Sequence, residues 1–217
     1  LAWLAKALNE KIGGIVFDEN HQRVFKPKPG DNGVLPFLKA LQIDSDDNVA
    51  AENSPEIGPS SKANNSNQAL LLSQLQRFNH LAPRGSLCFV ISDFYAFGSE
   101  DEASETGFEK ALYELSQRCD LNLLLIYDPF EAQALPEGRY RLSDGRALLE
   151  VNDSPLEQRQ RHCNIFRNRL EKIAKLGKQA GFNAHAIPTD APLLDVLNCQ
   201  LSAVPGQTNF SDLLGDD

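Results

Sequence analysis

Three aspartates stand where the sequence expects a β-strand to end. Asp18 follows the apolar run Ile15-Val16-Phe17, Asp93 follows Ser86–Ser92, and Asp128 follows Leu121–Tyr127. In open parallel sheets, ligands collect at the carboxyl ends of the strands. Carboxylate oxygens are also the ligands that hard divalent cations prefer in proteins. These positions could therefore hold an ion, either for binding a partner or for catalysis.

Asp93 is the strongest of the three candidates. The run before it, Ser86–Ser92, is nearly continuously apolar, which is typical of a strand buried on both faces of a parallel sheet. We expect a central strand, with the Asp93 carboxylate at the crevice beyond it. The alternative is that Asp93 caps the next loop by accepting backbone N–H groups. We expect Asp18 to belong to a hairpin turn and Asp128, which precedes Pro129, to a structural loop exit.

Catalysis is the second hypothesis. Clustered carboxylates can gather divalent ions for phosphoryl transfer, as in nucleases and phosphatases. The sequence has no GxSxG, GxGxxG, P-loop or HExxH motif. Its four histidines share no ligand spacing. We therefore expect a non-catalytic interaction module, with a metal-dependent phosphoryl-transfer enzyme as the alternative.

The composition narrows the class of protein. The 217 residues carry a net charge of −9 and have a pI near 5.0, which argues against binding nucleic acid through bulk charge. No apolar run approaches the roughly 20 residues that span a bilayer, so no membrane segment is expected. The four cysteines are scattered without a CxxC pair. We expect them to be reduced core residues, as in a cytoplasmic protein.

Strand and helix patterns alternate along the chain. We expect strands at 86–92, 121–127 and 182–187, and helices at 68–81, 108–118, 154–180 and 192–201, with an early hairpin between 15 and 26. The pattern predicts an α/β fold with an open, mostly parallel sheet and helices on both faces. The early hairpin would lie at its edge, and a second hairpin, 138–151, would be an insertion. One domain would span residues 1–204, with a flexible loop at 44–67 and a loose acidic tail at 205–217.

The helix expected at 154–180 carries many basic residues, among them Arg167 and Lys175. They could form a docking surface for an acidic partner. An ordinary solvated face is the other interpretation, because cations suit the carboxyl half of a helix.

Several segments resemble the domain-of-unknown-function family 58. They are Ile91-Ser92-Asp93-Phe94, Tyr127-Asp128-Pro129-Phe130-Glu131, and Leu135-Pro136-Glu137-Gly138 with the hairpin after it. The opening Ala7–Phe17 with Lys26–Gly30 is similar to the family's first helix and second strand. The resemblance implies a von Willebrand factor A-like (Rossmann-like) fold. It also implies a partnership with a MoxR-type AAA ATPase, chaperone-like, in the maturation or metal insertion of a client protein complex.

The resemblance further implies a metal-ion-dependent adhesion site. Of its pattern, only the aspartate after the fourth strand matches here, at Asp93, and the crevice rim beside it includes Ser92 and Phe94 as candidate partner contacts. Asp31 or Asn32 would have to replace the threonine of the middle loop. The Asp-x-Ser-x-Ser loop and the first, central strand would precede Leu1. We therefore expect Mg²⁺ in a full-length protein, none in this chain, and self-association through the open sheet.

Overall fold

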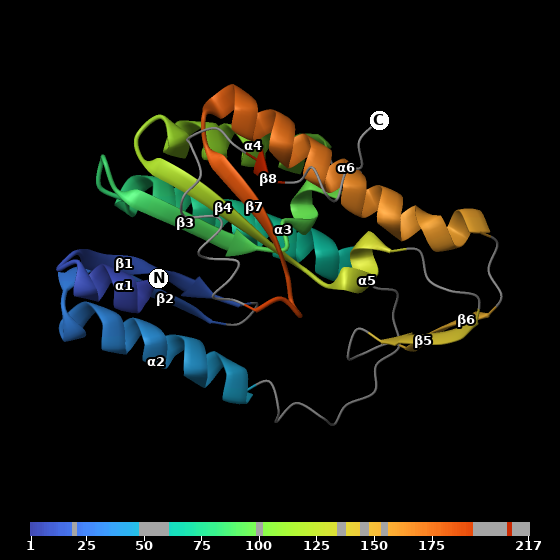
Figure 1. The fold of residues 1–217 in the computed structure, drawn as a ribbon, viewed down its shortest axis with the longest axis horizontal. Helices are drawn as coiled ribbons and strands as arrows, with labels where there is room; N and C mark the ends of the chain where they lie inside the picture. The colour runs from blue at the N-terminus through green and yellow to red at the C-terminus, as the bar shows by residue number, and fades with distance from the viewer. Residues whose placement is uncertain are drawn as a thin grey trace. The chain divides into compact units, whose positions relative to one another are not determined.

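The structure is a computed structural model. It describes residues 1–18, 21–47, 61–98, 102–133, 138–143, 148–152, 156–192 and 208–209. The chain divides into two compact units, Leu1–Leu81 and Ala82–Asp217. Helices and strands occur in both of them (Figure 1).

The first unit is built on a β-hairpin. Helix α1 (Ala2–Ala7) precedes strands β1 (Lys11–Phe17) and β2 (Gln22–Pro29), which pair antiparallel and confirm the expected hairpin. Its strands form a two-stranded sheet of their own, whereas we expected them at the edge of the parallel sheet. Gly30 then turns the chain with a φ of +59°, which glycine adopts without strain.

Two helices complete this unit, α2 (Asp31–Asp47) and α3 (Ser61–Leu81). They correct our prediction of a loop over 44–67, since the first and last residues of that stretch are helical and only 48–60 lie outside the described residues. The Ser- and Asn-rich start of α3 lacks apolar positions. Once the apolar turns of a helix form, however, each further residue adds a hydrogen bond at little cost.

A parallel sheet organises the second unit. Strands β3 (Leu87–Ser92), β4 (Asp120–Tyr127) and β7 (Asn183–Pro188) pair parallel in the order β3-β4-β7. The two-residue strand β8 (Thr208–Asn209) adds to β7, within the stretch that we expected to be a loose tail. The mixed α/β class and the parallel sheet that the alternation predicted are confirmed.

The position of β3 differs from the prediction. Among the described strands it pairs only with β4 and is the outer strand, and β4 is the central one. Burial follows this order: β4 is buried on both faces, whereas Leu87 and Ile91 of β3 are 59% and 58% exposed. An apolar run marks a strand, but the order of strands depends on pairings between distant segments that a local run does not encode.

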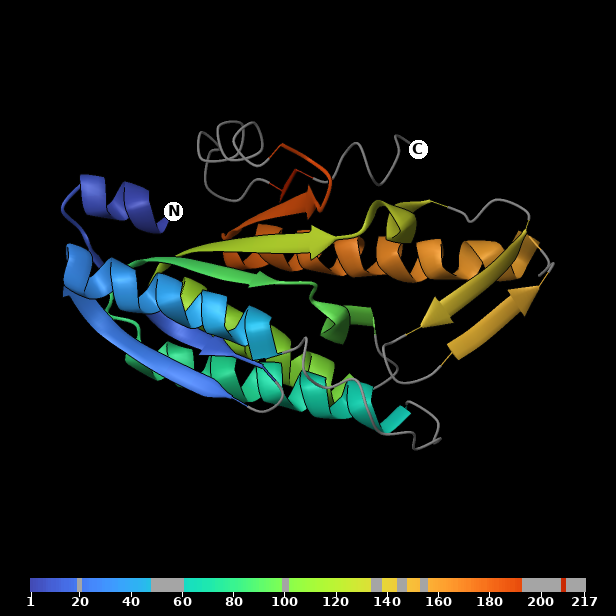
Figure 2. The same ribbon diagram turned by 90° about the horizontal axis from the view of Figure 1, so that it is seen from below.

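Helices α4 (Glu102–Ser116) and α6 (Leu156–Ala180) supply most of the core beside this sheet. α6 runs alongside the strands in both views (Figures 1 and 2). Its Phe166 ring lies 5.0 Å from the ring of Tyr127 on β4, so α6 packs on the face that carries the odd-numbered residues of β4. The helical side chains buried there include Phe108, Leu112, Leu115, Phe166, Leu170 and Ile173.

The remaining elements agree with the sequence patterns only in part. Strands β5 (Arg139–Ser143) and β6 (Leu148–Asn152) form the second predicted hairpin. Helix α6 ends at Ala180, and Gly181 directly after it has a φ of +77°, the left-handed stop that we expected there. The helix predicted at 192–201 falls almost wholly outside the described residues. No helix in the described part of the chain combines the length and apolar character needed to cross a membrane.

Candidate functional site

Asp93 ends β3 and starts a tight turn. Its Oδ1 accepts hydrogen bonds from the backbone N–H of Tyr95 (3.1 Å) and from the hydroxyl of Ser92 (3.3 Å). The short 3-10 helix η1 (Tyr95–Gly98) follows. Phe94 between them has a φ of +51°, a strained conformation for a bulky residue. The capping role, one of our two hypotheses for Asp93, is therefore the one that its hydrogen bonds support.

Asp128 plays a similar part at the end of β4. Its Oδ1 accepts from the N–H of Phe130 (2.9 Å), and Glu131 Oε1 accepts from the N–H of Asp128 (3.2 Å). These reciprocal bonds form a capping box on the single-turn helix α5 (Pro129–Ala132), with Pro129 in its first turn. Asp128 is thus the structural residue that the Asp-Pro sequence indicated.

Arg169 of α6 connects the two turns. Its side chain is only 2% exposed. Nη1 donates to the backbone carbonyl of Asp93 (3.0 Å) and to Glu131 Oε2 (3.2 Å), and the guanidinium carbon lies 5.1 Å from the Tyr95 ring centre and 5.6 Å from that of Phe166. A buried charge needs such a partner and hydrogen bonds to be tolerated. One side chain therefore fixes the ends of β3 and β4 to the same helix.

Arg169 was not among the expected site residues, because we interpreted the basic residues of this helix as one exposed face. A local signal was present. Phe166, Leu170 and Ile173 form the buried stripe, and position 169 falls within the same stripe at helical spacing.

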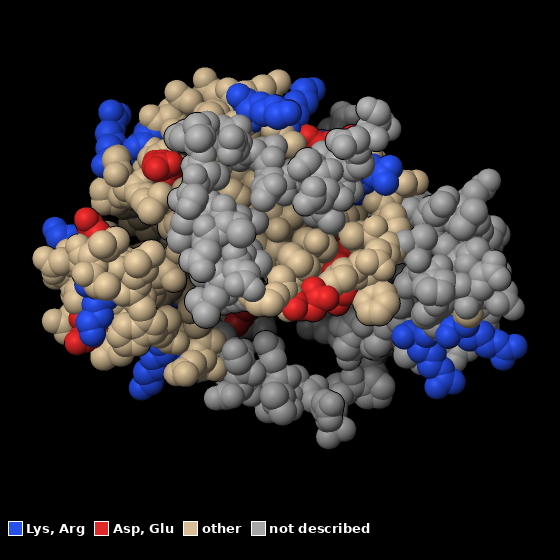
Figure 3. Space-filling model, in the orientation of Figure 1, with Lys and Arg blue, Asp and Glu red and all other residues tan. Residues whose placement is uncertain are grey.

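We call the surface formed by Asp93, Tyr95, Asp128 and Phe130 the strand-end rim. Both carboxylates are exposed, Tyr95 is 44% exposed and Phe130 is 67% exposed. Figure 3 shows acidic side chains where β4 and β7 end and α5 begins, with mainly uncharged residues around them. Tyr95 and Phe130 are therefore large apolar side chains that are exposed on turns held in place by hydrogen bonds. Such exposed apolar side chains mark a candidate contact surface.

The other predicted partner contacts differ in how exposed their side chains are. Phe94 is fully buried, with its ring 6.3 Å from that of Phe108, so its side chain cannot contact a partner and we remove it from the candidate surface. Ser92 is partly buried and accepts from the Phe94 N–H (3.2 Å). Arg167 and Lys175 are exposed on α6, which either of our interpretations of the basic face allows.

The proposed metal ligands are engaged elsewhere. Asp31 belongs to the first unit, where it pairs with Lys6. Asp18 closes the β1–β2 hairpin, as expected, by accepting from the backbone N–H of His21 (2.6 Å). Within the described residues, no three His, Cys, Asp or Glu side chains come together in a way that could hold a metal ion. With Asp93 Oδ1 used as a cap, the donors described here do not make up the adhesion site that the resemblance implies.

Buried polar groups of the sheet differ in how well they are satisfied: the buried Nδ1 of His185 has no hydrogen-bond partner in the described part of the chain. Asn183 donates to the Asn122 side chain (3.1 Å) across β7 and β4. Burial lowers the pKa of His185 on β7. On β3, burial first and the neighbouring Cys119 second raise the pKa of the Cys88 thiol to about 12, so this thiol is a core residue and a poor nucleophile.

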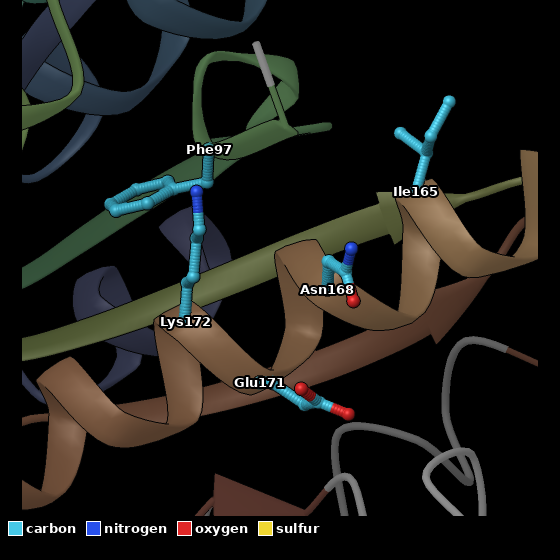
Figure 4. Close-up of a pocket in the computed structure, with 5 residues that line it drawn as sticks. All are labelled: Phe97, Ile165, Asn168, Glu171 and Lys172. Atoms are coloured by element: carbon cyan, nitrogen blue, oxygen red, sulfur yellow. The ribbon is translucent and has the colours of Figure 1, made fainter. Parts of the chain in front are cut away.

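A small cavity lies between η1 and α6. It measures about 230 Å³ and is lined by Phe97, Ile165, Asn168, Glu171 and Lys172. In Figure 4 the Lys172 side chain points toward Phe97, and its ammonium pairs with Glu105 of α4 (2.7 Å). The cavity is smaller than the roughly 300–1,000 Å³ of most small-molecule sites. It therefore gives no support to a substrate pocket.

Comparisons with known proteins give one match. No curated protein and no solved structure matches the sequence. Residues 1–169 match the family described as protein of unknown function DUF58. Because this match covers most of the 217 residues, the chain belongs to the DUF58 family.

Proposed function

We propose that this chain is a non-catalytic protein-interaction module and that the strand-end rim is its contact surface. The observation that carries the proposal is the pair of exposed aromatic side chains, Tyr95 and Phe130, on two turns that the buried Arg169 holds together. Aromatic side chains are enriched among the residues that dominate binding energy at protein interfaces. A rigid surface also loses little conformational entropy when a partner binds.

The partner that we propose is a MoxR-type AAA ATPase, acting with this chain in the maturation or metal insertion of a client complex. Support comes from the resemblance of the Ile-Ser-Asp-Phe and Asp-Pro-Phe-Glu segments to the family, together with the family match. The same resemblance leads us to propose a von Willebrand factor A-like fold. The parallel sheet with Asp93 at a strand end is compatible with it.

A metal-dependent phosphoryl-transfer enzyme is less well supported. That chemistry needs several carboxylates directed at one ion. Asp93 and Asp128 instead direct Oδ1 to backbone N–H groups of their own turns. The proposed contact at the strand-end rim does not require a metal ion held by these two carboxylates.

Binding to a MoxR-type AAA ATPase tests the proposal. The purified chain would be immobilised and its affinity for the ATPase measured by biolayer interferometry, with and without Mg²⁺. We expect Phe130→Ala to weaken binding by about tenfold, in line with the loss of an interface anchor. Tyr113→Ala is the matched control, because Tyr113 is a similarly exposed aromatic residue (49%) on α4 and outside the rim; its affinity should not change. An ATPase that does not bind, or that binds Phe130→Ala as well as the wild type, would contradict the proposal.

A further inference from the structure

We infer that Glu131 is a positioning residue for the turn between β3 and η1 and acts on it through Arg169, so that a disturbance of helix α5 changes the conformation of that turn. The coupling is a property of the chain alone, and its test needs no partner. Its consequence for binding does rest on the proposed function: for a partner at the rim, contact with α5 and contact with Tyr95 would not be independent.

One nitrogen atom carries the connection. Nη1 of Arg169 donates both to the backbone carbonyl of Asp93 (3.0 Å) and to Oε2 of Glu131 (3.2 Å). The guanidinium carbon also lies 5.1 Å from the centre of the Tyr95 ring. Helix α6, which carries Arg169, packs against both η1 and α5. A guanidinium that moves with Glu131 therefore cannot keep its contacts with the β3–η1 turn unchanged.

The two charges of the ion pair differ in exposure. The side chain of Arg169 is 2% exposed and that of Glu131 is 35% exposed. The Nε of Arg169 is buried and has no hydrogen-bond partner among the described residues, so the pairing with Glu131 offsets much of the cost of burying this charge. Removing one partner of such a pair leaves an uncompensated buried charge. We therefore expect the guanidinium to leave its position when Glu131 loses its charge, and the bond to the Asp93 carbonyl to break with it.

The β3–η1 turn depends on its surroundings. Phe94 has a φ of +51°, and backbone strain of this kind persists only where the surrounding structure enforces it. The bond from Arg169 ends on the carbonyl of the residue directly before Phe94. Within the turn, the Tyr95 N–H donates to Asp93 Oδ1 (3.1 Å). The Phe97 N–H donates to the carbonyl of Phe94 (3.0 Å). These two amides therefore report whether the turn has loosened.

Glu131 has two contacts that one substitution separates. Its Oε1 accepts from the N–H of Asp128 in the capping box, and its Oε2 accepts from Arg169. Glutamine keeps an oxygen acceptor and is itself a capping-box residue, but it carries no charge. Glu131→Gln therefore preserves the start of α5 and removes the charge that holds Arg169.

Amide hydrogen exchange, read for single residues by NMR on the full chain, tests the inference. We expect Glu131→Gln to speed the exchange of the Tyr95 and Phe97 amides by about tenfold, through local opening of the turn. The Phe130 amide on α5 should change by less than about twofold, because the capping box is kept. The buried Nε–H of Arg169, observed in the same samples, should exchange faster as well.

Two further variants control for the loss of charge and for the path. Glu114→Gln is the matched control, because Glu114 is a glutamate of α4 that pairs with Lys110 of its own helix. It should leave all of these rates unchanged. In the Arg169→Met background, Glu131→Gln should have no further effect on the Tyr95 amide, because the residue through which it acts is gone.

Four results would overturn the inference. They are unchanged exchange at Tyr95 and Phe97 in Glu131→Gln, an equal acceleration in Glu114→Gln, an acceleration that extends equally to the amides of β7, and an effect that persists in full in the Arg169→Met background. If Arg169→Met does not fold, the Arg169 Nε–H decides the path. An unchanged exchange rate of this proton in Glu131→Gln would then contradict a coupling through the guanidinium.

Discussion

The guanidinium of Arg169 donates a 3.0 Å hydrogen bond to the backbone carbonyl of Asp93, across 76 residues of sequence. The same Nη1 reaches Glu131 on α5 at 3.2 Å. The carboxyl ends of two neighbouring strands are therefore tied to one helix by a single buried cation. Whatever binds at the strand-end rim meets turns whose backbone is already fixed.

Replacing Arg169 with methionine should destabilise the second unit. The change keeps much of the apolar stem and removes the hydrogen bonds to Asp93 and Glu131. We expect a loss of about 2–4 kcal/mol in the free energy of unfolding, since a buried carbonyl and a half-buried carboxylate lose their partner. Urea denaturation followed by circular dichroism measures it.

Lys172→Met is the control for this change. Lys172 lies less than one turn further along α6 and pairs with Glu105, but its side chain is 44% exposed. Exposed ion pairs are worth at most about 1 kcal/mol. Equal losses for the two variants would show that Arg169 is no more than another surface charge.

Substitutions of Asp93 distinguish its capping role from its charge. Asp93→Ala removes the acceptor for the Tyr95 N–H and should cost about 1 kcal/mol of stability. Asp93→Asn keeps an acceptor and should cost only a few tenths. Thermal unfolding of both variants in EDTA measures the difference. If alanine and asparagine destabilise equally, the negative charge matters and the cap does not.

The sequence predicted the elements whose signals are local. The β1–β2 hairpin, the parallel pairing of strands 121–127 and 182–187, and the end of α6 before Gly181 all follow from apolar runs, short loops or a single glycine. Each of these signals lies within a few residues of the structure that it specifies.

What the sequence left open depends on distant contacts. The outer position of β3 is set by which strands pair. The apolar run Ser86–Ser92 by itself is as typical of a central strand as of an outer one. The burial of Arg169 depends on Asp93 and Glu131, which are 76 and 38 residues away. Phe94 was placed on the surface because its neighbour Asp93 is there. Its positive φ, which turns the ring into the core, has no signature in the sequence.

The raised pKa of Cys88 predicts that its thiol does not react with alkylating reagents in the folded chain. With a pKa of about 12, only about one molecule in ten thousand carries the thiolate at pH 8, and the thiolate is the reactive form. Iodoacetamide labelling of the native chain, read for each cysteine by mass spectrometry, should leave Cys88 unmodified. Labelling in denaturant is the control and should modify it fully. Rapid labelling of Cys88 in the native chain would mean that the β3–β4 pairing opens readily.

His185 should make the stability of the chain fall in mild acid. Its ring is 2% exposed, and burial lowers its pKa below the ordinary value of 6.5. In the range between the lowered pKa and 6.5, the unfolded chain binds a proton that the folded chain does not. Stability from this group is therefore complete above about pH 6.5 and is lost as the pH falls toward the folded pKa, by at most about 1.4 kcal/mol per pH unit for one proton.

The variant His185→Gln tests this contribution. It removes the titrating group, so its free energy of unfolding should fall less steeply between pH 7 and pH 5 than that of the wild type, even if the variant is less stable at pH 7. His80→Gln changes an exposed histidine of α3 and should leave the slope unchanged. Urea titrations at a series of pH values give both slopes. If the wild type and His185→Gln have the same slope, the imidazole is protonated in the folded chain as easily as in the unfolded one, and its burial on β7 does not control the acid response.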